Sequence, residues 1–189
     1  MSGLVKNHQK FHRAVSLMRN FFTEKGWIEV HTQDRRTILA ACEDPSTISL
    51  FNYDGTTWPL PQTGQMHLED HLLNEPSEKG YFCLSTSYRA EPNPIPGRHE
   101  TVFPMFEFEG HGDMSELLKV EKELLEFMGF KKEAYSNGTT RVYPEVEYTE
   151  MMKRYKTSEL EHEHEQQMWD DYGNVVLLKN FPYHTSPFW

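Results

Sequence analysis

The segment from Tyr81 to Glu109 constrains the fold more than any other part of the chain. It opens with residues 81–89, a run apolar enough to indicate a buried strand. Residues 92–99 contain three prolines, which stiffen a loop and exclude a helix. From Met105 onward apolar and acidic residues alternate, the pattern of a half-buried strand. The sequence therefore predicts two antiparallel strands joined by a long loop.

Helical patterns surround this strand pair. Residues 11–22 form one apolar stripe that ends before Gly26, and a half-buried strand is predicted over residues 27–32. A second helix is expected to open at Gly64, with short strands over 48–53 and 175–178 and helices over 113–128 and 148–167. Antiparallel strands with helices packed on one side predict an α+β domain. Core-facing positions are expected at Met66, Leu68, Leu72, Leu73, Leu117, Leu118, Leu124, Leu125 and Met128.

Composition narrows the function classes. The chain has 189 residues, which predicts one domain over residues 1–189, and no apolar run approaches the roughly 20 residues of a membrane span. Lys and Arg number 19 against 29 Asp and Glu, a net charge of −10 that argues against a broad, non-specific grip on nucleic acid. The two cysteines, Cys42 and Cys83, form no CxxC pair, and we therefore expect a reducing, cytoplasmic location.

Four charged residues belong to the strand pair. The outgoing strand is expected to carry Arg89 and Glu91, two residues apart and so on one face. The return strand carries Glu107 and Glu109 with the same spacing. An arginine rooted in a strand holds a phosphate in two parallel hydrogen bonds. The alternative is that these residues form ion pairs across an exposed sheet face.

The connecting loop adds the remaining candidates. Arg98 and His99 can cover the far end of a polyphosphate, and the Phe103 ring offers a stacking face for adenine. The residues alone therefore suggest a nucleotide that lies across a sheet, without a glycine-rich phosphate loop. His162 and His164 are not expected to bind a metal, because they sit about 200° apart on a helix.

Motif spacing in this region resembles motif 2 of class II aminoacyl-tRNA synthetases, and is most similar to the subgroup for aspartate, asparagine and lysine. The matching segments are residues 88–91, 99–103 and 106–109. Residues 11–32 resemble motif 1, and residues 63–69 resemble the amino-acid-site segment of asparaginyl enzymes. Residues 148–150 and 181–189 resemble further segments of those enzymes. The resemblance implies a class II synthetase-like antiparallel sheet flanked by helices.

The resemblance also implies nucleotide-binding roles. Arg89 would bind the α-phosphate of ATP and the amino acid's carboxylate, and Glu91 would orient Arg89 or contact the adenine amino group. His99, with Arg98, would hold the γ-phosphate, and Phe103 would stack on adenine. Arg89, Glu91 and His99 are thus the expected catalytic residues.

The amino-acid end follows from the same resemblance. Gln65 and Glu107 would contact the ammonium group of asparagine or aspartate, with Glu109 in the same subsite. The carboxylate would attack the α-phosphorus of ATP and release pyrophosphate, helped by Mg²⁺. The magnesium-binding glutamate and the motif 3 arginine would lie beyond Trp189, so the sequence is expected to be a truncated core that binds ATP weakly.

Other departures from the family pattern bear on specificity and partners. Gln33 replaces the motif 1 proline, Leu68 stands where aspartyl enzymes have a lysine, and Ser186 where asparaginyl enzymes have one. The core begins almost at Met1, so no anticodon-binding OB domain is expected before it. A homodimer through the first helix and the strand after it is implied.

Three functions remain open at this point. The first is activation of asparagine or aspartate for transfer to tRNA. The second is a tRNA-independent asparagine synthetase-like reaction, in which ammonia attacks aspartyl-adenylate. The third is a non-catalytic paralogue that binds a nucleotide or a partner.

Overall fold

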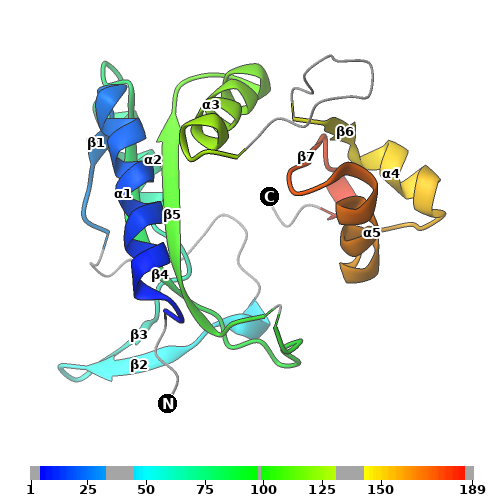
Figure 1. Cartoon of the computed structure of the whole chain (residues 1–189). Coiled ribbons are helices and arrows are strands. Elements are labelled where there is room, and N and C mark those ends of the chain that lie inside the picture. The colour runs from blue at the N-terminus through cyan, green and yellow to red at the C-terminus, as the bar shows by residue number, and fades with distance from the viewer. Residues whose placement is uncertain (1–4, 33–44, 98, 131–142, 186–189) are drawn as a thin grey trace. The chain divides into compact units, whose positions relative to one another are not determined.

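The computed structural model describes residues 5–32, 45–97, 99–130 and 143–185. The chain divides into two compact units; the first contains the described residues up to Asp113 and the second begins at Met114 (Figure 1). The single catalytic domain expected over residues 1–189 stays a prediction, because this division does not test it.

Helix α1 (His8–Glu24) begins and ends much as the sequence predicts. The Asn7 side chain accepts a hydrogen bond from the backbone N–H of Lys10 at 2.9 Å, which satisfies one donor of the first turn. Gly26 follows with a φ of +79°, a left-handed conformation that glycine adopts without strain. The predicted helix over residues 11–22 and its end at Gly26 are confirmed.

The main sheet of the first unit has three strands, in the order β1 (Ile28–Glu29), β4 (Gly80–Tyr88) and β5 (Val102–Gly110). β4 and β5 pair antiparallel, which confirms the predicted strand pair and its long connection. β1 runs parallel to β4, and Val30 adds one more backbone hydrogen bond to β4. The strand predicted over residues 27–32 is shorter than expected, because pairing with β4 stops there.

One face of the β4–β5 pair carries an aromatic core that α1 covers (Figure 1). The Phe22 side chain is fully buried. It packs against three rings of the sheet at centroid distances of 5.5, 5.7 and 4.8 Å, those of Phe82, Phe106 and Phe108 respectively. Burial of each such ring stabilises the unit by roughly 1.5–3 kcal/mol.

The opposite face of the pair packs against α2 (Gln65–Asn74). Leu68 is fully buried in one apolar cluster with Tyr81 and Cys83. Since α1 and α2 cover opposite faces, the expectation that helices pack on one side is wrong here, although the α+β class is confirmed. Leu73 is 81% exposed, contrary to prediction, because a helix turns by about 140° in the five residues after Leu68.

A separate hairpin consists of β2 (Leu50–Tyr53) and β3 (Thr56–Pro59), paired antiparallel. Asp54 and Gly55 join the two strands with φ values of 50° and 74°, the positive angles that suit a tight two-residue hairpin turn. The strand predicted over residues 48–53 is therefore confirmed from residue 50 onward.

The second unit combines three helices with a two-stranded parallel pair. Its elements are α3 (Met114–Phe127), β6 (Glu145–Glu147), α4 (Tyr148–Tyr155), α5 (His162–Tyr172) and β7 (Leu177–Lys179). Short 3-10 turns, η1 (Pro45–Thr47) in the first unit and η2 (Tyr183–Thr185) in the second, complete the described structure.

Three predictions for the second unit need correction. The single helix expected over residues 148–167 is two helices, because Lys156 adopts a left-handed φ of 55° and ends α4. The last strand covers residues 177–179 instead of 175–178. The face predicted to be buried in α3 is only half-buried, at Leu118, Leu124, Leu125 and, directly after the helix, Met128, and Leu117 is 41% exposed, contrary to prediction.

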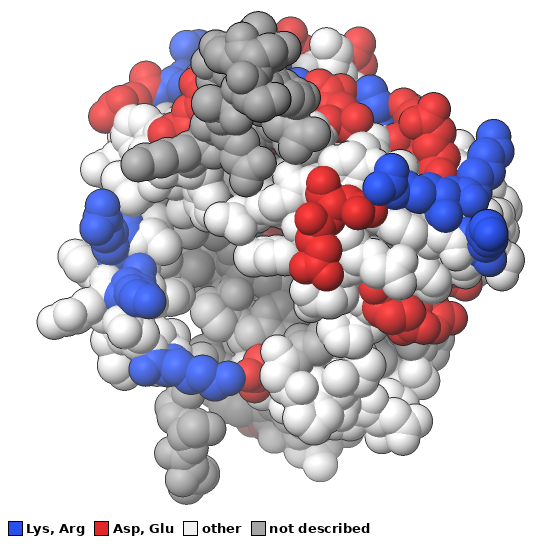
Figure 2. Space-filling view, turned by 45° about the vertical axis from the view of Figure 1, so that its right-hand side comes forward, with Lys and Arg blue, Asp and Glu red and all other residues white. Residues whose placement is uncertain are grey.

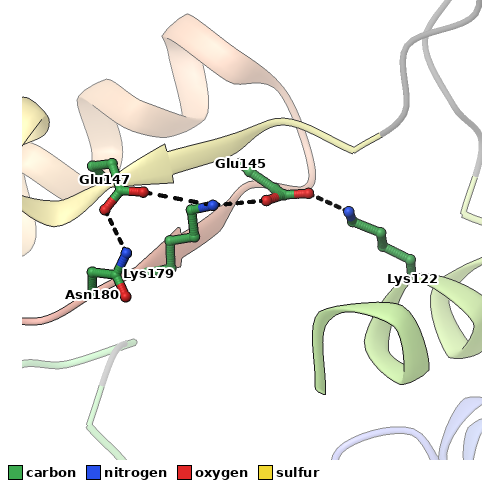
Figure 3. A network of polar contacts seen from close by, with 5 residues as sticks. All are labelled: Lys122, Glu145, Glu147, Lys179 and Asn180. Atoms are coloured by element: carbon green, nitrogen blue, oxygen red, sulfur yellow. Dashed lines mark hydrogen bonds and ion pairs between the residues drawn. The ribbon is translucent and has the colours of Figure 1, made fainter. Parts of the chain in front are cut away.

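A charged network ties β6 to β7 and α3 (Figure 3). The Glu145 carboxylate forms ion pairs with Lys122 and, at 2.9 Å, with Lys179. Lys179 also lies 3.6 Å from a Glu147 oxygen, and the Asn180 amide donates to Glu147 at 2.7 Å. Hydrogen bonds from the two lysines hold the pKa of Glu145 below its ordinary value.

Candidate active site

The face of the β4–β5 pair that α1 does not cover carries most of the polar residues selected from the sequence. The register places Glu107 opposite Cys83 and Phe103 opposite Ser87. Directly opposed residues of antiparallel strands share a face, so these four side chains lie on the same side of the sheet. Arg89 follows Ser87 by two residues, and its backbone N–H still bonds to the chain just before β5.

Both oxygens of the Glu107 carboxylate accept hydrogen bonds from the protein. Oε2 accepts from the backbone N–H of Gly64 at 2.7 Å and from the Ser85 hydroxyl at 2.5 Å. Oε1 accepts from the Thr63 hydroxyl. Gly64 is also the N-cap of α2, the helix end that carries positive partial charge. The carboxylate is therefore held in one orientation by three donors.

Only glycine fits at position 64. A β-carbon there would lie 2.6 Å from the Sγ of Cys83 and 3.1 Å from the Oε2 of Glu107. Burial, and secondly the charge of Glu107, raise the pKa of the Cys83 thiol to about 12. The thiol therefore stays protonated at neutral pH and packs as a small apolar group.

Glu109 lies beside Glu107 on the same face and accepts a hydrogen bond from the Gln65 amide at 2.8 Å. Burial raises the pKa of Glu109 above its ordinary value. The Gln65 hydrogen bond opposes this rise, and the charges of Glu69 and Glu107 add to it. Two carboxyl groups on one face make this end of the site suited to a cationic group such as an ammonium.

Arg89 is partly buried, and its Nε has no hydrogen-bond partner among the described residues. The alternative of ion pairs across the sheet is not observed there, since Glu107 and Glu109 accept from hydroxyl, amide and backbone donors. A buried donor left unpaired costs about 1–3 kcal/mol. The guanidinium is thus a suitable place for an anionic ligand.

Glu91 is not carried by β4. The strand ends at Tyr88, and the backbone N–H of Ala90 donates to the carbonyl of Thr47 at 2.8 Å, so the chain has left β5 by this point. The expectation that one strand presents Arg89 and Glu91 on one face is therefore wrong. Glu91 is half-buried and forms no hydrogen bond or ion pair with another described residue.

The other nucleotide candidates lie in and after the loop. Phe103 is half-buried in β5, on the same face as the acidic pair. The Nδ1 of His99 accepts a hydrogen bond from the backbone N–H of Ile95 at 3.3 Å, within the loop itself. Arg98 lies outside the described residues. The structure thus brings Gln65, Glu107 and Glu109 together and does not bring His99 into contact with them.

The sequence interpretation missed the donors that hold Glu107. Thr63 and Gly64 lie in the segment 63–69 that resembles the amino-acid site, but the sequence pattern assigns them no contact with Glu107. The pattern does not single out Ser85 either. A signal for Ser85 exists: a hydroxyl inside an otherwise apolar buried strand needs a hydrogen-bond partner. Its partner depends on the strand register, which the sequence does not contain.

Within residues 5–32, 45–97, 99–130 and 143–185, no group of three or more His, Cys, Asp or Glu could hold a metal ion. His164 has a structural role, since its Nδ1 accepts from the backbone N–H of Glu161 at 3.0 Å in the capping box of α5.

The surface adds two observations. On the face in view in Figure 2, acidic and basic side chains of the described residues are interspersed, without one extended basic area. Among the helices that the structure describes, none combines the length and apolar character needed to cross a membrane.

Comparison with known proteins decides the family. Residues 3–189 match the family model described as tRNA synthetases class II (D, K and N). The chain belongs to this family. No individually curated protein sequence matches this class II synthetase chain.

Solved structures agree with the family on the fold. The asparaginyl-tRNA synthetase from Pyrococcus horikoshii, complexed with asparaginyl-adenylate, is 21% identical with a TM-score of 0.73. The match covers 92% of this chain and 44% of that one. The Entamoeba histolytica enzyme with the same ligand is 19% identical, with a TM-score of 0.67 and coverages of 93% and 43%. This class II chain thus spans less than half the length of both relatives and has the predicted synthetase-like fold.

Proposed function

We propose that this class II synthetase chain activates an amino acid with ATP, forming an aminoacyl-adenylate, and that the amino acid is asparagine. One observation carries the proposal: a single sheet face presents a partly buried arginine, whose Nε has no hydrogen-bond partner among the described residues, and, farther along, a fixed acidic pair. The arginine is Arg89 and the acidic residues are Glu107 and Glu109. An adenylate needs both ends, since it joins a phosphate to a residue with a free ammonium group.

At the nucleotide end, Arg89 binds the α-phosphate and the carboxylate that attacks it. A carboxylate oxygen forms the new bond to the α-phosphorus while the bond to pyrophosphate breaks, and no proton has to move. Phe103 stacks on adenine, His99 with Arg98 holds the γ-phosphate, and Glu91 contacts the adenine amino group. No cluster of the described residues suits a magnesium ion, so none is assigned to it.

At the amino-acid end, Gln65, Glu107 and Glu109 bind the ammonium group. Asparagine is favoured over aspartate because the position of the aspartyl-type lysine holds Leu68, which is fully buried. No cation then comes from that position to neutralise an aspartate side chain. The asparaginyl-adenylate named for the two solved relatives supports the same choice.

Amino-acid-dependent exchange of labelled pyrophosphate into ATP tests the proposal. Because the chain is expected to bind ATP weakly, we expect slow exchange that requires asparagine. It should fall more than about tenfold in Arg89→Ala, because one charge-assisted phosphate contact contributes about 1.5–3 kcal/mol. Arg154→Ala is the control, since Arg154 pairs with Asp171 within the second unit and has no role in the proposed site. Wild-type exchange in Arg89→Ala would refute the assignment.

A second function keeps the chemistry and changes the acceptor. The net charge of −10 favours a small acceptor such as ammonia over tRNA. In that case aspartate, not asparagine, supports exchange, and asparagine forms from aspartate, ATP and ammonia without tRNA. We place either reaction in the cytoplasm, because the two cysteines form no CxxC pair and suit a reducing location.

A further inference from the structure

We propose that Ser85 is a positioning residue for the amino-acid end of the site, which fixes the Glu107 carboxylate for the ammonium group of the ligand. The inference rests on the proposed function. Ser85 lies on β4 at a diagonal position to Glu107, and its hydroxyl donates to Oε2 at 2.5 Å. A bond this short is typical of a hydroxyl that donates to a charged carboxylate.

Counting acceptor positions shows what Ser85 contributes. A carboxylate offers about four hydrogen-bond positions, two on each oxygen. On Glu107, Oε2 accepts from Gly64 and Ser85 and, weakly, from the Cys83 thiol, while Oε1 accepts one bond from Thr63. Among the described residues, the remaining position is therefore on Oε1, and the Gln65 amide contacts only Oε1 of Glu109. The donors on Oε2 therefore determine where the last acceptor position points.

Loss of the Ser85 hydroxyl leaves no good replacement. The other group near Oε2 is the Cys83 thiol at 3.8 Å, which is a weak donor. Water has little access, because Ser85 is 4% exposed. Without this donor the carboxylate loses its fixed orientation, and a carboxylate that turns holds an ammonium group less firmly.

Ser87 provides a matched control on the same strand. It follows Ser85 by two residues, so both side chains belong to one face of β4. Both are buried, but the Ser87 hydroxyl has no hydrogen-bond partner among the described residues. Replacing either by alanine removes one buried oxygen, and only Ser85→Ala removes a contact with Glu107.

Calorimetric titration with a stable asparaginyl-adenylate analogue, in which a sulfamoyl group replaces the phosphoryl group, tests the inference. Each variant also receives the des-amino form of the analogue. We expect Ser85→Ala to bind the complete analogue about tenfold more weakly. It should bind the des-amino form like the unmodified chain, and Ser87→Ala should bind both forms normally.

Other outcomes overturn the inference. Equal affinity of Ser85→Ala and the unmodified chain shows that the hydroxyl does not matter. An equal loss for both analogues shows that it acts through the structure and not through the ammonium group. If Ser85→Ala does not fold, Ser85→Cys, which keeps the size and donates weakly, takes the same test. Absence of binding by the unmodified chain defeats the proposed function and this inference with it.

Discussion

Replacing Gly64 by alanine adds a β-carbon at the most crowded point of the candidate site. That carbon would lie 2.6 Å from the Cys83 Sγ and 3.1 Å from the Glu107 Oε2. Gly64 has an ordinary φ of −91°, so alanine is not excluded by its backbone preference. Crowding is the dominant cause of the expected loss of stability.

The magnitude follows from the partners of the new carbon. The Cys83 side chain is fully buried against Leu68 and Tyr81, so a shift of its sulfur displaces other core atoms, and overpacking of such a core costs about 1–3 kcal/mol. Alanine is also a poorer N-cap than glycine, which acts in the same direction. We expect the free energy of unfolding of the first unit to fall by about 1–3 kcal/mol.

Urea denaturation of a double-mutant cycle measures the effect. Cys83→Ala removes the sulfur, so Gly64→Ala should cost at least about 1 kcal/mol less in that background. Gly97→Ala is the control: its φ of +84° predicts a loss through backbone strain, but no atom lies within 4 Å of its added carbon. Strict additivity of Gly64→Ala and Cys83→Ala would refute the crowding argument.

Three further outcomes are expected. The pKa of Glu109 is raised in the folded state, so the folded chain keeps a proton that the unfolded chain releases above about pH 4.5. The free energy of unfolding therefore falls as the pH rises from about 4.5 through the pKa of the folded state. Glu109→Gln should flatten this decline in urea denaturation measured across pH. The lowered pKa of Glu145 has the opposite sign, so Glu145→Gln should destabilise the second unit at neutral pH and not in acid, and salt near 1 M should shrink the difference. We also propose a homodimer through α1 and β1, and a monomer in sedimentation at micromolar concentration would contradict it.

Local patterns predict the elements that bury one clear face. The Phe22 stripe marks α1, and the alternation around Glu107 marks β5, because each pattern matches the period of its element. A helix end that depends on a single backbone angle is not predicted from the sequence. Lys156 ends α4 in a left-handed conformation, which a lysine rarely adopts and which no sequence pattern predicts.

The site was predictable in its residue types but not in its contacts. The spacing of Glu107 and Glu109 places them on one face, and the structure agrees. The donors to Glu107 come from the N-terminus of α2 and from a diagonal position on β4. Both depend on register and on the closeness of helix and sheet, which are tertiary properties. The predicted position of Glu91 on the strand is wrong because the backbone N–H of Ala90 donates to the Thr47 carbonyl, which takes the chain away from β5.

The decisive measurement is where an adenylate binds on the chain. Backbone amide NMR of the chain, titrated with the sulfamoyl analogue of asparaginyl-adenylate, reports each N–H separately. We expect the largest saturable shifts at Gly64, whose amide donates to Glu107, at Ser85 and near Arg89. The turn of the β2–β3 hairpin at Asp54 and Gly55 should not respond. Absence of saturable shifts, or shifts confined to residues away from this sheet face, would contradict the account.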